Sequence, residues 1–478
     1  MHVHMQIIKQ EKGKIIMFQK KTPVSQRLKI IIVGCGKVGT TLVEQLSKEG
    51  HDLTVIDHDA KRIQEIAGYF DVLGIVGNGA SHSIQVEAGI EHADLFIAVT
   101  ESDELNLLCC TIAKQDGDCS TIARIRTPDY LNDSAYLREK LGLAMVINPE
   151  LEASKEVARL LYLPAALEIN SFAHGRIELI KIKITEDNLL CGKKIYELGS
   201  NITSNILVCA IERNNQVFIP SGDSSIENGD CISFLATRQM AKYFFSYIGF
   251  KTHQVKNTLI IGGGKSSFYL AKQLLQMGID VKIIEKDITR CEELSILLPE
   301  AIIINGDGTD QELLQEEGIE HMESFVPLSG IDEENVMLTL YARQVSDAKV
   351  ITKINRMTFK DVIGQLDLGS VVYPRYITSE AIIAYVRAKK ASMNSNVETL
   401  YHMFDSKAEA IEFHVNEKSD VTDTPLMNLA LKKNLLVCCI MRNESVIIPG
   451  GRDEIKVGDT VMIVTTHTGF NDLQDILD

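Results

Sequence analysis

The stretch KIIIVGCGKVGTTLVEQL, residues 29–46, decides the fold of this chain. Residues 30–33 are apolar and β-branched, which is typical of a buried strand in a parallel sheet and too short a run for a helix. Gly34, Gly36 and Gly39 follow as G-x-G-x-x-G, and the apolar residues after them recur every four positions, as on one face of a helix. The stretch therefore predicts a strand, a glycine turn and a helix.

A glycine turn of this kind is typical of a site for the phosphates of a nucleotide. The first glycine permits a tight bend, the second lets a pyrophosphate approach the backbone, and the third allows the helix to pack closely on the strand. The helix N-terminus presents free N–H groups and a positive dipole end to the phosphates. Glycine turns also occur for purely structural reasons, so the pattern needs support from its surroundings.

The next predicted strand, DLTVID at residues 52–57, supplies that support. It ends in Asp57, which comes 18 residues after Gly39. An acid at this position can accept hydrogen bonds from both ribose hydroxyls and repels a 2′-phosphate, so NAD or an adenosine nucleotide is favoured over NADP. The strand, the helix and the acid together favour a functional nucleotide site.

The same pattern returns as NTLIIGGGKSSFYLAKQL at residues 257–274. Gly262, Gly264 and Glu285 stand 228 residues after their counterparts in the first copy. Further along, VGNGA and SDELN answer to NGDGT and IDEEN at an interval of 229 residues. A unit of about 230 residues is thus duplicated, which is too long for a solenoid repeat.

Each unit divides into an alternating β/α part and a small α+β module. Helical stretches alternate with short apolar runs in the first part, which predicts a doubly wound parallel sheet. In the second part, two runs flank Asn214 and Asn215, which tolerate the left-handed conformation of a tight hairpin. The strands of the first sheet are expected near Ile30, Leu53, Val72, Leu95, Ile122 and Met145.

The predicted fold class is α/β, with two tandem Rossmann-like domains that are each followed by a small α+β module. We expect an N-terminal leader at 1–27, disordered, a Rossmann-like domain at 28–148, a linker helix and small module at 149–250, a second Rossmann-like domain at 256–373, and a second linker helix and small module at 374–478.

Composition narrows the class of protein. A chain of 478 residues suggests three or four domains. The net charge of −16 is spread along the sequence and argues against nucleic acid as a partner. The ten cysteines show no C-x-x-C spacing, which indicates reduced thiols in a cytosolic protein. No apolar run approaches the length of about 18 residues that a spanning helix needs, so we expect any membrane role to be exercised from outside the bilayer.

The segments IIIVGCGKVGTTL, VTESDELNLL, ARIRTPDYL and VINPELEAS, all in one duplicated chain, resemble the Trk potassium-uptake regulatory protein family. The resemblance covers about residues 28–478. It implies two RCK units, in which an N-terminal nucleotide-binding domain regulates potassium conductance and a C-terminal domain accompanies it. It also implies a cytoplasmic, peripheral protein that assembles as a tetrameric ring beneath a membrane-embedded Trk-type potassium channel subunit and binds NAD(H) or ATP and ADP.

This chain departs from the family pattern in two places. The basic leader before Leu28 is longer than the family pattern, and Ser267 stands where the second copy should have its third glycine. Because Ser267 adds a side chain where helix and strand approach most closely, we expect the second site to be weaker or tuned to a different nucleotide.

The residues expected around the first nucleotide lie at the carboxyl ends of the parallel strands, where open α/β sheets bind ligands. Asn78 could hydrogen-bond an adenine edge, or it could be an ordinary turn residue between two glycines. Arg124 and Arg126 share a sheet face, where a guanidinium could meet a phosphate, a neighbouring subunit or an ordinary ion-pair partner. The predicted site residues of the first copy are Gly34, Cys35, Gly36, Lys37, Val38, Gly39, Asp57, Asn78, Thr100, Glu101 and Arg124.

The second copy offers the counterparts. Lys353 replaces Arg124, which keeps the charge but loses the planar fork. Glu285 is one methylene longer than Asp57, so we expect the ribose to sit differently. The predicted site residues of the second copy are Gly262, Gly264, Lys265, Ser266, Glu285, Asp307, Ser329 and Lys353.

No catalytic or metal-ligating residue is predicted. The histidines in loops, among them His51, His58, His82 and His92, lack metal spacing and are expected on the surface. The alternative function is a cytosolic NAD-dependent dehydrogenase, but such an enzyme needs a positioned acid or base and a substrate domain, and no such constellation recurs in both copies. A storage or scavenging protein for nucleotides is a third interpretation.

Overall fold

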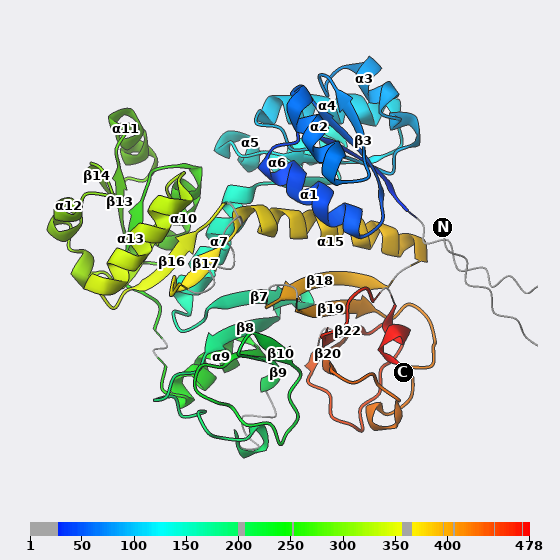
Figure 1. Ribbon diagram of the computed structural model, residues 1–478, viewed down its shortest axis with the longest axis vertical. Coiled ribbons are helices and arrows are strands. Elements are labelled where there is room, and N and C mark those ends of the chain that lie inside the picture. Colours follow the sequence, from blue (N-terminus) through cyan, green and yellow to red (C-terminus); the bar gives the residue numbers. More distant parts are fainter. Residues whose placement is uncertain are drawn as a thin grey trace, which may run out of the picture.

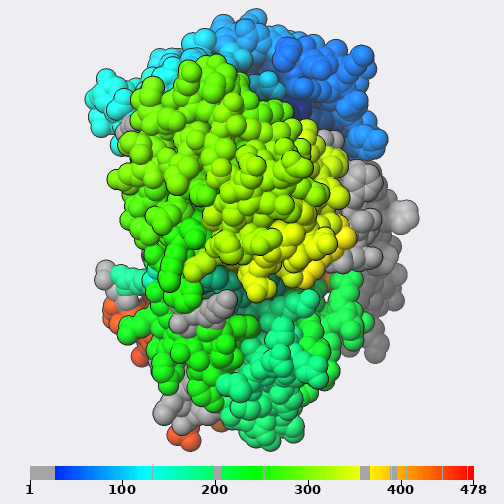
Figure 2. Space-filling view, turned by 90° about the vertical axis from the view of Figure 1, so that its left-hand side faces the viewer, coloured from blue at the N-terminus to red at the C-terminus, as the bar shows by residue number. Residues whose placement is uncertain are grey.

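The computed structural model describes residues 27–198, 206–250, 253–355, 366–394, 396–404, 407–443, 445–470 and 472–478. Within these ranges the chain forms two six-stranded and two five-stranded sheets. Figure 1 shows the two parallel-sheet domains in the upper part of the molecule and the two antiparallel modules below them. Figure 2 shows from the side that the first of these modules lies below the second parallel-sheet domain. The predicted fold class is confirmed. The predicted leader lies outside the described residues except for Arg27, and the domain boundaries stay predictions.

The first Rossmann domain has the strand order β3-β2-β1-β4-β5-β6, and all neighbouring strands are parallel. The chain order reverses at β1, so a topological switch point lies between the carboxyl ends of β1 and β4. The elements are β1 (Lys29–Val33), α1 (Lys37–Lys48), β2 (Asp52–Asp57), α2 (Ala60–Tyr69), β3 (Leu73–Val76), α3 (His82–Glu87), β4 (Leu95–Ala98), α4 (Asp103–Asp116), β5 (Ser120–Arg124), α5 (Pro128–Asn132), α6 (Ser134–Leu141) and β6 (Met145–Ile147).

The first small module is an antiparallel sheet in the order β10-β9-β11-β8-β7. Asn214 and Asn215 have φ angles of 50° and 65° and connect β9 to β10, as the sequence predicted. The elements are α7 (Pro149–Tyr162), which leads into the module, β7 (Glu168–Phe172), β8 (Ile177–Lys183), β9 (Ile206–Arg213), β10 (Gln216–Phe218), β11 (Cys231–Ala236) and α9 (Arg238–Tyr247).

The second half repeats this plan, with sheet orders β14-β13-β12-β15-β16-β17 and β18-β19-β22-β20-β21. The Rossmann elements are β12 (Asn257–Ile261), α10 (Lys265–Gln276), β13 (Asp280–Glu285), α11 (Ile288–Leu297), β14 (Ile302–Asn305), α12 (Gln311–Glu316), β15 (Ser324–Pro327), α13 (Asp332–Val345), β16 (Lys349–Lys353) and β17 (Ser370–Val372). Those of the small module are α15 (Pro374–Asn394), β18 (Val397–Met403), β19 (Ala408–His414), β20 (Leu435–Arg442), β21 (Ser445–Ile447) and β22 (Thr460–Thr465).

The crossover helices α7 and α15 each pack against the Rossmann domain of the opposite half. Val157 of α7 joins the apolar core that contains Leu270 and Leu274 of α10. Ile382 and Val386 of α15 belong to the core of the first Rossmann domain, which α1 also lines. The two helices also contact each other near the centre of the molecule. The halves are therefore interlocked, because each lends the other a helix.

The two small modules pack sheet against sheet. Phe172 and Leu179 of the first module share an apolar core with Phe404 and Cys438 of the second. The N–H of Ala173 donates to Glu412 Oε1 across this boundary at 2.7 Å. All ten cysteines are free, as predicted, and burial raises the pKa of Cys109 and Cys439 to about 12. These thiols therefore act as small apolar side chains.

One prediction about the surface was wrong. His51 is only 6% exposed, because the chain folds back after α1 and places this side chain beside the start of β1. Its Nδ1 accepts a hydrogen bond from the Leu28 N–H at 3.2 Å. His51 is thus a buried structural residue. Among the described residues, no helix combines the length and apolar character needed to cross a bilayer.

Candidate functional site

The first glycine turn joins β1 to α1 and is packed tightly on one side and open on the other. Gly34 has a φ angle of +99°, and a Cβ there would lie 2.9 Å from the Thr100 nitrogen. A Cβ on Gly39 would lie 1.9 Å from the Gly34 carbonyl oxygen. Gly36, in contrast, has no atom within 4 Å of its would-be Cβ. The open side at Gly36 and the uncapped N-terminus of α1 leave room and N–H donors for phosphates.

Asp57 at the end of β2 is held against this turn. Its side chain is buried, with Oδ2 accepting from the Cys35 N–H at 2.6 Å and Oδ1 accepting from the Asp59 N–H at 2.9 Å. Oδ2 retains a lone pair for a ribose hydroxyl, whereas Oδ1 also lies 3.2 Å from Nδ1 of the exposed His58. Burial, and to a smaller extent the Asp57 carboxylate, raises the pKa of the Cys35 thiol to about 12. Cys35 therefore contributes its backbone N–H to the site and no reactive thiolate.

Asn78 lies at the carboxyl end of β3 but bonds its own turn. Its Oδ1 accepts from the Ala80 N–H at 3.0 Å, which is the turn-residue arrangement. Its counterpart Asp307 likewise accepts from the Thr309 N–H at 2.9 Å, and this bond holds the pKa of Asp307 below its ordinary value. A role for either side chain toward a base stays a prediction.

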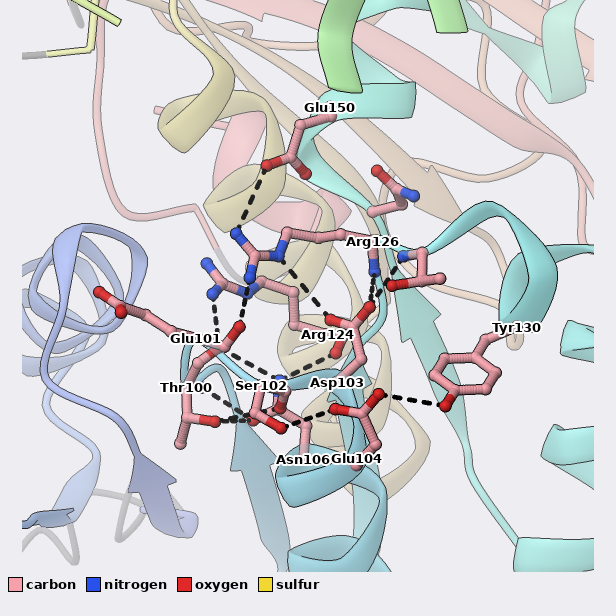
Figure 3. A network of polar contacts seen from close by, with 12 residues as sticks. Thr100, Glu101, Ser102, Asp103, Glu104, Asn106, Arg124, Arg126, Tyr130 and Glu150 are labelled. Carbon is pink, nitrogen blue, oxygen red and sulfur yellow. Dashed lines mark hydrogen bonds and ion pairs between the residues drawn. The ribbon is translucent and has the colours of Figure 1, made fainter. Parts of the chain in front are cut away.

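Beside the switch point, Arg124 and Arg126 enter a polar network (Figure 3). Arg124 donates to the Thr100 carbonyl and Arg126 to the Glu101 carbonyl, so both guanidinium groups brace the loop after β4. Burial and the neighbouring Arg126 lower the pKa of Arg124. The Nε atoms of both arginines have no hydrogen-bond partner, although they are buried. The Nε of Arg126 faces the Asp103 carboxylate at 3.7 Å, so the buried Nε of Arg124 is the one without a charged neighbour of this kind.

Three residues of this network were not predicted as site residues. Asn106 is fully buried, and its side chain bonds the Thr100 N–H at 2.8 Å and the Arg124 carbonyl at 2.9 Å. Asp103 accepts from the backbone N–H of Arg126 at 2.9 Å; burial alone would raise its pKa, but such bonds lower it below the ordinary value. Glu150, at the start of α7, lies 4.0 Å from Arg126. The repetition of Asp103 and Asn106 in the second copy was the signal that could have identified them.

The second glycine turn, between β12 and α10, is built on the same plan with altered packing. Ser267 is fully buried, and its hydroxyl donates to the Gly262 carbonyl. Gly262 keeps a φ angle of +94°, but its would-be Cβ now has 3.4 Å to the nearest atoms. The Gly264 position is open, as at Gly36. Ser267 is therefore accommodated by a looser turn.

Glu285 reaches the position that Asp57 holds in the first copy. Its Oε2 accepts from the Gly263 N–H at 2.5 Å and its Oε1 from the Asp287 N–H at 2.8 Å. A Cβ on Gly263 would lie 3.0 Å from Glu285 Cγ. The longer acid fits because glycine replaces the cysteine of the first turn.

Lys353 lies at the boundary between the halves. Its Nζ donates to the Leu328 carbonyl at 2.8 Å. Burial lowers the pKa of Lys353 to about 8, although Asp332 and Glu150 oppose this shift. A small cavity between α7 and the second turn is lined by Lys353, Ser266 and Ser154, among others. Ser329 keeps the local plan of Thr100, since its N–H donates to Asn335 Oδ1 at 2.9 Å.

The remaining predicted residues sit at the two helix N-termini. Lys37 and Lys265 are the exposed first residues of α1 and α10, Val38 is buried beneath its turn, and Ser266 is half-buried. In the part of the chain that the structure describes, no group of three or more histidine, cysteine or carboxylate side chains could hold a metal ion.

The fold and the paired turns define a protein with two Rossmann-type nucleotide-binding domains, each followed by a companion module. The TrkA-N domain family matches residues 30–149 and 258–374, and the TrkA-C domain family matches residues 179–249 and 410–478. The chain therefore belongs to the TrkA family.

Named relatives agree with this membership. The chain is 32% identical over 458 residues to the Trk system potassium uptake protein TrkA homolog 1 of Methanosarcina mazei, covering 94% of this chain and 99% of that protein. It is 32% identical over 443 residues to the Trk system potassium uptake protein TrkA of Haemophilus influenzae, covering 91% and 95%. The GsuK RCK domain shares the fold, with a TM-score of 0.60, 16% identity, and coverage of 92% of this chain and 93% of that one. The GsuK channel bound to NAD gives a TM-score of 0.61 and 15% identity, with coverage of 93% and 77%.

Proposed function

We propose that this protein is the nucleotide-binding regulatory subunit of a Trk-type potassium uptake system. It binds NAD(H), or ATP and ADP, and gates a membrane-embedded potassium channel subunit. It works as a homotetrameric ring on the cytoplasmic face of the membrane, held there by its channel partner, and it does no chemistry on the nucleotide. The names of its relatives support the transport system, and the two turns support the ligand.

The observation on which the proposal rests is the geometry of the first turn. Asp57 is fixed by the Cys35 N–H at 2.6 Å, while Gly36 is open beside the start of α1. A ribose on the carboxylate would therefore direct its phosphates to the N–H groups of the turn. The second turn offers the same pairing of Glu285 with the open Gly264. The structure thus supports two nucleotide sites in each chain.

Gating requires that the nucleotide prefer one conformation of the ring. A ligand that binds both conformations equally shifts nothing, whereas a tenfold preference gives about 1.4 kcal/mol per site. Several sites in a closed ring would add their preferences. The interlocked crossover helices are suited to this role, because a shift of one Rossmann domain displaces a helix of the other half.

The test is reconstitution of the protein with its cognate channel subunit in liposomes, followed by potassium flux with NADH, NAD, ATP and ADP in turn. We expect flux to depend on the protein and to differ between nucleotides, and the nucleotides to be recovered unchanged. Equal flux with every nucleotide and without the protein would contradict the proposal. Conversion of NADH during flux would favour the dehydrogenase instead.

A matched pair of variants separates the turn from the rest of the domain. Gly36→Asp places a negative charge where the phosphates approach, so it should abolish the response of the first site. Gly68→Asp introduces the same group at another glycine of the domain whose would-be Cβ also meets no atom within 4 Å. We expect Gly68→Asp to bind and respond as the natural protein does. Equal loss in both variants would mean that the charge acts on folding and not on the site.

A further inference from the structure

Tyr269 forms a polar connection between the two halves of the chain. It belongs to α10, the helix that starts at the second glycine turn, and it is only 5% exposed. Its hydroxyl donates to the Arg126 carbonyl at 2.7 Å and accepts from Asn148 Nδ2 at 3.2 Å. Both partners belong to the first half, so a single hydroxyl joins the phosphate-binding helix of one site to the surroundings of the other.

Each end of this connection is rigidly attached to a nucleotide site. Tyr269 is five residues after Gly264, or about 8 Å along a helix axis. The N–H of Arg126 donates to Asp103 at 2.9 Å, and its guanidinium group to the Glu101 carbonyl, in the loop beside the first site. Asn148 caps α7, since its Oδ1 accepts from the Leu151 N–H at 2.9 Å. A movement of α10 would therefore act on the loop after β4 and on the start of α7 through these bonds.

A second contact one helical turn later fixes the relative orientation of the helices. Gln273 Nε2 of α10 donates to Ser154 Oγ of α7 at 2.8 Å, and Ser154 is 2% exposed. The counterpart of Tyr269 in the first half is Thr41, whose hydroxyl donates within its own helix to the Lys37 carbonyl at 3.0 Å. The hydroxyl connection at Tyr269 is thus a specialisation of α10 and has no equivalent at Thr41.

We infer that Tyr269 is a positioning residue that couples the occupancy of the two nucleotide sites. The inference rests on the proposed function, because it requires both turns to bind an adenine nucleotide. A nucleotide that draws the N-terminus of α10 toward its phosphates changes the affinity of the first site through Tyr269, and the linkage is reciprocal. Because the contact consists of two hydrogen bonds of one hydroxyl, its removal should change the coupling factor about two- to tenfold.

The experiment measures NADH binding to the full chain by calorimetry, with Gly264→Asp used to block the second site. The affinity of the first site is compared with the second site open and blocked, and the ratio is the coupling factor. We expect a coupling factor different from one in the natural chain. In Tyr269→Phe the coupling factor should move toward one by a factor of about two to ten. Tyr341→Phe is the control, because it removes a hydroxyl from the same domain that, among the described residues, bonds the exposed Gln315 alone, at 3.3 Å.

A second variant guards against loss of folding in Tyr269→Phe. Asn148→Ser removes the amide that donates to Tyr269 but keeps a side chain that caps α7. It should lower the coupling in the same direction with α7 intact. If both sites bind and the ratio is unchanged in Tyr269→Phe and Asn148→Ser, the inference is wrong while the proposed function stands. If neither turn binds a nucleotide, both fail.

Discussion

The two glycine turns of this chain solve one packing problem in two ways. In the first, Gly39 is required because a Cβ would lie 1.9 Å from the Gly34 carbonyl oxygen. In the second, Ser267 fills the same position and its hydroxyl bonds the Gly262 carbonyl. The surroundings of Gly262 are also looser, since a Cβ there would lie 3.4 Å from the Leu328 carbonyl oxygen and from Ser329 in the loop after β15. The third glycine is thus one way to set the distance between helix and strand, and a hydroxyl is another.

The acid of each turn is matched to the residue that follows the first glycine. Asp57 stands with Cys35 and Glu285 with Gly263, and both carboxylates reach the same N–H of the turn. The expectation that the longer acid places the ribose differently stays a prediction. The acid and the residue after the first glycine thus differ as a pair, so exchanging the acid alone should weaken binding and exchanging both should restore it.

The largest effect is expected from moving serine into the first turn. Gly39→Ser should lower stability by about 3 kcal/mol, because its Cβ would lie 1.9 Å from the oxygen of Gly34, which is itself packed tightly against Thr100. The reverse change, Ser267→Gly, should cost only about 1 kcal/mol for the lost hydrogen bond. Thermal unfolding of both variants measures the asymmetry. Equal losses would show that the two turns are equally tight.

The next effect is on ligand binding. Asp57→Ala should weaken NADH binding at the first site about ten- to hundredfold, because charge-assisted bonds to the ribose are lost. Asp52→Ala, at the exposed other end of β2, is the control and should bind normally. Calorimetry on both variants decides this. Unchanged binding of every adenine nucleotide to Asp57→Ala would remove Asp57 from the site.

A pH effect of intermediate size is expected from one half-buried carboxyl group on each of the two crossover helices. Burial raises the pKa of Glu156 on α7 to about 7 and that of Glu380 on α15 to about 8, and Glu168 adds to both shifts, while Arg159 and Arg387 oppose them. Groups with a raised pKa stabilise the fold fully below pH 4.5, and this contribution is lost as the pH rises through 7 and 8.

The free energy of unfolding should therefore fall by about 1–2 kcal/mol between pH 5 and pH 8.5. This figure is smaller than the pKa shifts alone would give, because both side chains are only half-buried and solvent screens them. The control is the double variant Glu156→Gln and Glu380→Gln, in which this part of the pH dependence should vanish. Thermal unfolding across the pH range compares the two proteins. If stability changed with pH equally in both proteins, Glu156 and Glu380 would not cause this pH dependence.

The smallest effect tests the paired exchange of acids. Asp57→Glu alone should weaken nucleotide binding about fivefold, or about 1 kcal/mol, because the Cys35 side chain crowds the longer acid. Adding Cys35→Gly should restore most of the affinity. The coupling energy of this double-mutant cycle is the quantity to measure. A purely additive result would show that Gly263 and Glu285 were not fitted to each other.

Much of this architecture was predictable because its signals are local. Apolar runs of four or five residues marked the parallel strands, and the interval from Gly39 to Asp57 placed the acid at the turn. The repetition of Asn106 in the second copy marks the residue, but its role was not predictable, because its four bonds join segments that meet only in the folded sheet. The burial of His51 and the packing of α7 on α10 were not predicted for the same reason. An amphipathic pattern shows that one face of a helix is buried, but it does not show which element covers that face.

The exchange of crossover helices has a consequence for how the two halves can diverge. Two separate copies of one half could interlock in the same way. In such a symmetric dimer, however, every substitution would change both interfaces at once. Joining the halves in one chain guarantees that each meets its opposite and removes that restriction. Thr41 and Tyr269 show the result, since equivalent positions now face different neighbours. Fusion has turned a symmetric pair into two interfaces that natural selection can alter one at a time.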